Sequence, residues 1–231
     1  PVGGTVIQPD TNLPDAETFI RHFAHGQRYL KSRFGKPSRV AWAADSFGHS
    51  AGLPEILAAS GIDSFAFSRP APNIVPIAKP AFWWEGPGGS RILAYRPAAG
   101  WYGCEREEVT KRLDACLEEA RKTDLHNVAV FFGLGNHGGG PTRRHLKDIR
   151  AWAKTHPEIN VDFSGLHKLF AALRSEIADK PADFLPAHRG ELNFVLRGCY
   201  SSVARFKFPY RKTENLLQRA ERTDAVVGGE T

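Results

Sequence analysis

Residues 41–50 read AWAADSFGHS, and this stretch decides the fold of the chain. Residues 38–42 are typical of a short buried strand, and apolar residues recur at helical spacing over 53–57. Gly61 stands where the C-terminal cap of that helix is expected. Asp45 is therefore expected at the carboxyl end of a strand, in the turn that leads into a helix.

The position of Asp45 has two interpretations. In α/β folds, ligands bind and catalytic side chains collect at the carboxyl edge of the sheet. A carboxylate beside a histidine there would serve as a nucleophile, a base or a metal ligand. Alternatively, Asp45 or Ser46 only accepts hydrogen bonds from free N–H groups of the turn. The local pattern leaves both interpretations open.

Composition excludes several classes of protein. The chain has 231 residues, 42% hydrophobic and 24% charged, which predicts a soluble globular protein with one large domain or one and a half. No apolar run approaches the roughly 20 residues that span a bilayer, so a membrane protein is not expected. The chain begins at Pro1 and contains no Met, which we interpret as a piece of a longer protein.

The net charge and the spacing of the cysteines argue against further classes of protein. The net charge is +6, but acidic residues interrupt the basic C-terminal tract, so nucleic-acid binding is not expected. The three cysteines are widely spaced and form no C-x-x-C pair. They argue against a disulfide framework or a cysteine zinc site and favour a reducing compartment.

The rest of the chain alternates between predicted strands and predicted helices. This alternation predicts a mostly parallel α/β sheet, with a hairpin turn at 86–89. Beyond a proline-rich boundary at 181–186, a charged helix is expected from Tyr200 to about 225, with Pro209 kinking or restarting it. Helices are predicted over 15–34, 105–122, 142–154 and 166–177, and further strands over 63–67, 82–85, 91–95, 127–132 and 159–163.

A glycine-rich loop at 133–138 matches G-x-G-x-x-G between a predicted strand and a predicted helix, which is the pattern of a dinucleotide site. However, residues 139–141 extend the loop, so the helix is expected to begin only at Thr142. The phosphates would then lose the helix N-terminus that holds them. The other interpretation is a loop that lets a ligand approach the backbone closely and offers Asn136 and His137 to it.

Six separated stretches, in this order along the chain, resemble glycoside hydrolase family 38, the α-mannosidases, and in particular their bacterial and cytosolic branch. They are PDTNLP at 9–14, GQR at 26–28, DSFGHS at 45–50, FWWEG at 82–86, GNHGGGPT at 135–142, and GEL with RGCYSS at 190–192 and 197–202. The resemblance implies part of a seven-stranded parallel α/β barrel over 1–188, a partial catalytic domain. Residues 189–231 would then begin a helical middle domain, with the first helix of a three-helix bundle.

The resemblance also implies a function, which is retaining hydrolysis of terminal α-mannosides in oligosaccharides, in the cytoplasm. Asp45 matches the family residue that is both the nucleophile and a zinc ligand. One of its carboxylate oxygens would bind the metal while the other faces the anomeric carbon. His49, Trp84, Asn136 and His137 are expected to contact the substrate.

This chain departs from the family pattern at two places. The family's other zinc ligands come from an H-x-D motif and a later histidine, and neither occurs here, so the fragment is expected to be inactive alone. Where some members carry an acid in the glycine loop, this chain has Asn136 or its neighbour His137, and an amide cannot donate a proton as a general acid. Asp10 and Glu85 are candidates for the acid.

Other functions remain open at this stage. One is a catalytically inactive sugar-binding domain, and another is a dinucleotide-binding oxidoreductase that uses residues 133–138. A zinc-dependent deacetylase would need an H-x-x-x-H pair beside Asp45, and none accompanies it. The expected partner is a mannose-containing oligosaccharide, with neither nucleic acid nor a membrane, and with a homo-oligomer for the full-length protein.

Overall fold

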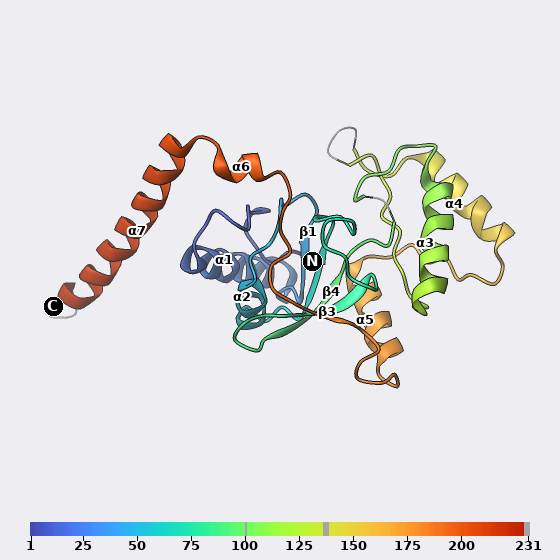
Figure 1. The fold of residues 1–231 in the computed structure, drawn as a ribbon, viewed down its shortest axis with the longest axis horizontal. Helices are drawn as coiled ribbons and strands as arrows, with labels where there is room; N and C mark the ends of the chain where they lie inside the picture. Colours follow the sequence, from blue (N-terminus) through green and yellow to red (C-terminus); the bar gives the residue numbers. More distant parts are fainter. Residues whose placement is uncertain (100, 136–138, 229–231) are drawn as a thin grey trace.

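The fold is built on one five-stranded sheet with helices on both faces (Figure 1). The computed structural model describes residues 1–99, 101–135 and 139–228. The elements in chain order are α1 (Ala16–Phe34), β1 (Val40–Ala43), α2 (Leu53–Ala59), β2 (Ser64–Phe67), β3 (Ala81–Glu85), β4 (Arg91–Tyr95), α3 (Val109–Thr123), α4 (Arg143–Thr155), α5 (Leu166–Ile177), β5 (Ala187–Arg189), α6 (Arg197–Ser201) and α7 (Ala204–Val227).

The sheet has the strand order β1-β2-β4-β3-β5. β1 pairs with β2, β2 with β4, and β3 with β5, all in parallel. β3 and β4 form an antiparallel hairpin across the 86–89 turn, as the glycines there predict, with Trp84 opposite Ile92. The mixed α/β class is confirmed. A seven-stranded barrel is not, because the sheet of the described residues has five strands, with β1 and β5 as its outer strands.

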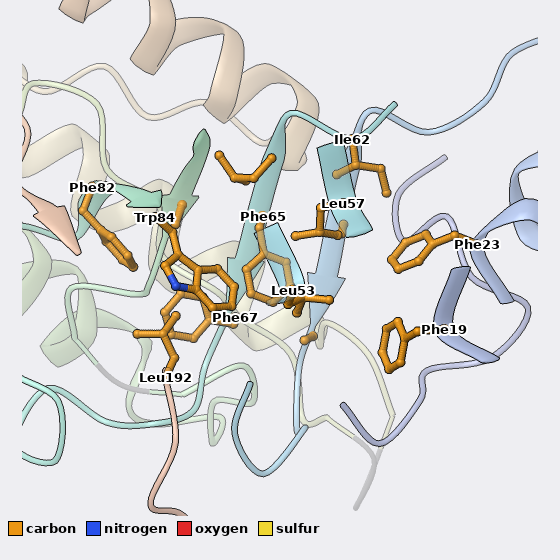
Figure 2. Close-up of a cluster of buried hydrophobic side chains, with 14 of the residues drawn as sticks. Phe19, Phe23, Leu53, Leu57, Ile62, Phe65, Phe67, Phe82, Trp84 and Leu192 are labelled. Carbon is orange, nitrogen blue, oxygen red and sulfur yellow. The ribbon is translucent and has the colours of Figure 1, made fainter. Parts of the chain in front are cut away.

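Successive side chains of each strand point to opposite faces of the sheet, so each face has its own hydrophobic core. Figure 2 shows the first core, in which α1 and α2 cover aromatic side chains of β2 and β3. The residues at its centre are Phe19, Phe23, Leu53, Leu57, Phe65, Phe67, Phe82 and Trp84, all at most 4% exposed. Because burying such a side chain contributes about 1.5–3 kcal/mol, this face stabilises the part of the chain that carries the 41–50 turn.

The opposite face is covered mainly by α5. Leu169, Phe170 and Leu173 of this helix pack against Leu93 and Tyr95 of β4 and their neighbours. The remaining pair of helices, α3 and α4, packs together around a smaller cluster beside the sheet (Figure 1).

The predicted strand at 127–132 is wrong, because these residues join no sheet in the structure. They lie across the α5 face, where Phe131 stacks on Trp42 with ring centroids 5.0 Å apart. The Tyr95 hydroxyl, rather than a neighbouring strand, accepts a hydrogen bond from the Ala129 N–H at 2.8 Å. The apolar side chains of residues 127–132 are explained by their contact with a face of the sheet. The periodicity of apolar residues does not by itself predict which backbone groups form hydrogen bonds.

The predicted strand at 159–163 is also absent from the sheet. This segment and residues 127–132 both line a cavity of about 510 Å³ between α3, α4 and α5. Its walls are largely apolar.

The C-terminal helices extend away from the sheet (Figure 1). The chain starts α7 anew after Ser202, and α7 then continues through Pro209, so the predicted restart at this proline is wrong. Pro209 is the sixth residue of α7, where its ring removes one backbone donor without ending the helix. Among the described residues, no helix combines the length and apolar character that crossing a membrane requires.

Candidate active site

The carboxyl edge of the sheet brings together residues from three strands. Asp45 follows β1, Arg69 follows β2 and Arg96 follows β4. Because these three strands are parallel neighbours, their carboxyl ends meet at one edge. The expected position of Asp45, at the end of a strand and before a helix, is confirmed.

Asp45 forms an ion pair with Arg69. Nε of Arg69 donates to Oδ1 of Asp45 at 2.7 Å, and the two side chains are 24% and 36% exposed for Arg69 and Asp45. The guanidinium of Arg69 lies over the rings of Trp101, 4.1 Å from Cζ to centroid, and Phe47, at 5.4 Å. The carboxylate is thus held in one orientation beside aromatic rings while remaining open to solvent.

Tyr102 adds a hydroxyl to this group. Burial raises its pKa, and the negative charge of Asp45 and a hydrogen bond to it raise the pKa further. The ring of Tyr102 also lies 4.5 Å from that of Trp101, centroid to centroid. Asp45 therefore sits between a cation and a neutral phenol, both of which donate hydrogen bonds.

The turn around Asp45 is held by the segment 8–11 at the start of the chain. The Gln8 amide, oriented with its oxygen toward the turn, accepts from the N–H groups of Ala44 and Asp45 at 3.3 and 3.1 Å. The Ser46 hydroxyl donates to the Pro9 carbonyl at 3.3 Å. Gln8 thus caps the turn, which is one of the roles open to Asp45 or Ser46, and the Asp45 carboxylate instead accepts from Arg69 and Tyr102.

His49 is fully buried behind this turn. The Thr11 hydroxyl donates to the Gly48 carbonyl, so its oxygen accepts from Nδ1 of His49, 3.0 Å away. Burial lowers the pKa of His49 to about 3, so the ring is neutral near pH 7. We expected His49 to contact substrate, but in the structure the ring exposes no surface to a ligand and instead fixes the turn.

Trp84 is fully buried as well. Its indole Nε1 donates to the Gly190 carbonyl at 2.9 Å, and its ring lies 6.2 Å from that of His49. The ring is therefore enclosed by the core rather than presented for stacking on a sugar, which is the role that we expected.

Asn136 and His137 lie outside the described residues, but the base of their loop is described. The Cys104 N–H donates to the Gly133 carbonyl at 2.6 Å. A Cβ at Gly135 would come within 3.2 Å of the Tyr102 ring. The glycine loop thus starts against the tyrosine that interacts with Asp45.

The helix after this loop begins as predicted. Thr142 caps α4 by accepting from the His145 N–H at 3.1 Å, and His145 in turn accepts from the Thr142 N–H at 3.2 Å. The helix N-terminus therefore lies beyond residue 138, and the His145 N–H of its first turn already has a side-chain partner. This arrangement disfavours a dinucleotide site at 133–138.

The two acid candidates lie in different places. Glu85 does not lie beside Asp45, because it ends the antiparallel strand β3 at the opposite edge of the sheet. There it pairs with Arg91 and Arg189 at 3.3 and 2.7 Å. Asp10 lies in the segment along the Asp45 turn. Its Oδ1 accepts from the N–H groups of Asn12 and Leu13 at 2.9 and 3.1 Å.

A zinc site is incomplete in the described part of the chain. No three His, Cys, Asp or Glu side chains gather there in a group that could hold a metal ion. Zinc sites in proteins normally take at least three protein ligands, and Asp45 supplies at most one. The described residues therefore do not fit a zinc ion by themselves.

Sequence reasoning missed Arg69, Trp101 and Tyr102 as site residues. Arg69 directly follows a predicted strand, which is a usable signal, but only the strand order shows that this strand adjoins β1. Trp101 and Tyr102 belong to no regular element, and no local pattern points to them.

Residues 1–191 match the N-terminal domain of glycosyl hydrolases family 38. The chain belongs to this family. It is 35% identical to "Alpha-mannosidase 2C1" of Homo sapiens over 225 residues, and 30% identical to "Alpha-mannosidase" of Saccharomyces cerevisiae over 229 residues. These alignments cover 96% and 95% of the chain, but only 21% of each relative.

A solved structure has a similar fold. The crystal structure of an alpha-mannosidase from Enterococcus faecalis aligns with a TM-score of 0.62 and 20% identity, over 82% of this chain and 22% of that one. The match over residues 1–191 and the similarity to the two α-mannosidases confirm the resemblance to family 38, and with it the assignment to the glycoside hydrolases.

Proposed function

We propose that this chain is part of the catalytic domain of a retaining α-mannosidase, with Asp45 as its nucleophile. The observation that carries the proposal is the Asp45–Arg69 pair, open to solvent at the carboxyl edge of the sheet and flanked by Trp101 and Phe47. Aromatic faces beside a carboxylate suit a sugar ring, whose C–H groups stack on them. The names of the relatives support mannose as the sugar.

In the proposed reaction, Asp45 attacks the anomeric carbon while the leaving oxygen takes a proton from a carboxylic acid. Water then attacks the covalent glycosyl-enzyme, and the same acid, now a base, removes its proton. Arg69 holds Oδ1 of Asp45, which leaves the second oxygen to form the bond. Retention needs the acid about 5–5.5 Å away. Asp10 is the candidate in this chain, and an acid elsewhere in the longer protein is the other.

The remaining parts of the proposal concern the whole protein. Residues 1–188 would belong to a seven-stranded barrel, and residues 189–231 would begin a helical domain. Zinc, when bound through Asp45 and ligands from outside this chain, would add positive charge beside the nucleophile and the sugar hydroxyls. The fragment would therefore be inactive alone.

The test is hydrolysis of an aryl α-mannoside by the full-length protein. We expect Asp45→Asn to lower kcat by roughly 10⁴-fold, as loss of a nucleophile does, and a chelator to abolish activity. Asp63→Asn is the matched control, since Asp63 is also paired with arginines but precedes β2 at the other edge. Retained activity in Asp45→Asn would remove this residue from the mechanism. Binding of mannose without turnover by the wild type would favour a sugar-binding domain.

A further inference from the structure

Arg96 is a buried cation that the proposed mechanism does not use. It follows β4 at the carboxyl edge and is 4% exposed. In the described part of the chain its side chain forms no ion pair, and burial lowers its pKa to about 10. Because a buried charge is costly without compensating partners, its hydrogen bonds indicate what it does.

Among the described residues, its hydrogen bonds go to one loop, residues 70–80. Nη1 of Arg96 donates to the carbonyls of Pro70 at 3.1 Å and Val75 at 2.9 Å. The Arg96 backbone N–H donates to the Pro80 carbonyl at 2.9 Å. Arg96 therefore contacts the loop at its start, its middle and its end.

The loop needs an external donor. Four of its eleven residues are prolines, which have no N–H to offer to the loop's carbonyls. Its internal backbone bonds run from the N–H groups of Ile74 and Val75 to the Ala71 carbonyl. A guanidinium presents several N–H groups in a rigid fork, so one side chain satisfies carbonyls at separate points.

The loop connects Arg96 to the nucleophile. Pro70, whose carbonyl Arg96 holds, directly follows Arg69, which donates to Asp45 and lies over Trp101. We propose that Arg96 is a positioning residue: by fixing the Pro70 carbonyl, it sets the backbone of Arg69 so that the guanidinium meets Asp45. This inference rests on the proposed function for its kinetic consequence, but its structural consequence is independent of it.

The kinetic test is a double-mutant cycle in the full-length protein with an aryl α-mannoside. We expect Arg96→Met to lower kcat/KM about tenfold or more when Arg69 is present, but less than about twofold in an Arg69→Ala background. Arg96→Lys, which keeps the charge without the fork, repeats the cycle if the methionine variant does not fold. Arg91→Met is the control, because Arg91 lies on the same strand at the opposite edge. Equal losses in both backgrounds, or no loss, would overturn the proposal.

A second readout does not depend on activity. Displacement of Arg69 changes the surroundings of Trp101, so Arg96→Met should change the tryptophan emission, and this change should vanish in a Trp101→Phe background. An unchanged spectrum would overturn the positioning role. If the wild type fails to hydrolyse α-mannosides but the Trp101-dependent change is present, the proposed function fails and the positioning of Arg69 stands.

Discussion

At the scale of single residues, the site depends on partners that are distant in sequence. Asp45 meets Arg69 from the next strand, and the turn is capped by Gln8 from the start of the chain. His49 and Trp84 differ from expectation for one physical reason. The core behind the turn encloses both rings, so neither offers a surface to a ligand.

Gly48 is required at its position in the turn. Its φ is +124°, and an added Cβ would come within 2.3 Å of Oδ1 and 3.1 Å of Cα of Asn193. We expect Gly48→Ala to destabilise the protein by about 1–3 kcal/mol, because strain and a backbone clash combine. Urea unfolding measures the loss.

The control for this variant is Gly61→Ala. Gly61 also has a positive φ, +76°, but nothing lies within 4 Å of an added Cβ. It therefore reports the backbone strain alone, about 1–2 kcal/mol. Equal losses at the two glycines would show that the contact with Asn193 has no energetic consequence.

His49 makes stability depend on pH. Its pKa falls from 6.5 to about 3 on folding, so below pH 6.5 the unfolded chain binds a proton that the folded chain does not. Stability contributed by the neutral ring is therefore lost as pH falls from 6.5 toward 3, by roughly 2 kcal/mol between pH 6.5 and 5. Urea unfolding at both pH values measures this slope, and His49→Gln should lack that contribution. The same slope in the variant would contradict the assignment.

At the scale of elements, α7 is attached to α1 by polar contacts. Glu214 of α7 has an 8% exposed side chain and pairs with Arg211 at 2.7 Å. It accepts from the Asp15 N–H at 3.1 Å and the Thr18 hydroxyl at 2.5 Å. Asp15 is the N-cap of α1, so one carboxylate joins α7 to the N-terminus of α1.

We expect Glu214→Ala to weaken the attachment of α7 by about 1–3 kcal/mol, because it leaves the Asp15 N–H and the Thr18 hydroxyl without their acceptor. Hydrogen exchange at the amides of α7 should speed up accordingly. Glu221→Ala removes the exposed pair with Arg21 and should change exchange by less than about 1 kcal/mol. A Glu214 effect no larger than that of Glu221 would refute the special role of the buried carboxylate.

At the scale of the whole molecule, the parallel order of β1, β2 and β4 assembles the site. The carboxyl ends of these three strands, which come from separate parts of the chain, lie at one edge of the sheet. Asp45, Arg69 and Arg96 follow these three neighbouring strand ends. The antiparallel β3 carries Glu85 to the far edge, which separates this acid candidate from Asp45, whereas Asp10, the other acid candidate, lies along the Asp45 turn.

The sequence by itself determined the elements whose signals are local. The helix from Ala16 to Phe34 follows from its Asp15 cap, its apolar face and Gly35, and the β3–β4 hairpin follows from its glycine turn. The family and the place of Asp45 were also readable, because both reside in short continuous motifs. Only the tertiary structure decided that residues 127–132 lie across a sheet face and that Arg69 is the partner of Asp45. Backbone pairing and side-chain contacts across the sheet depend on which segments of the chain lie next to each other. An apolar pattern indicates that a segment is buried, but it does not indicate which other segment covers it.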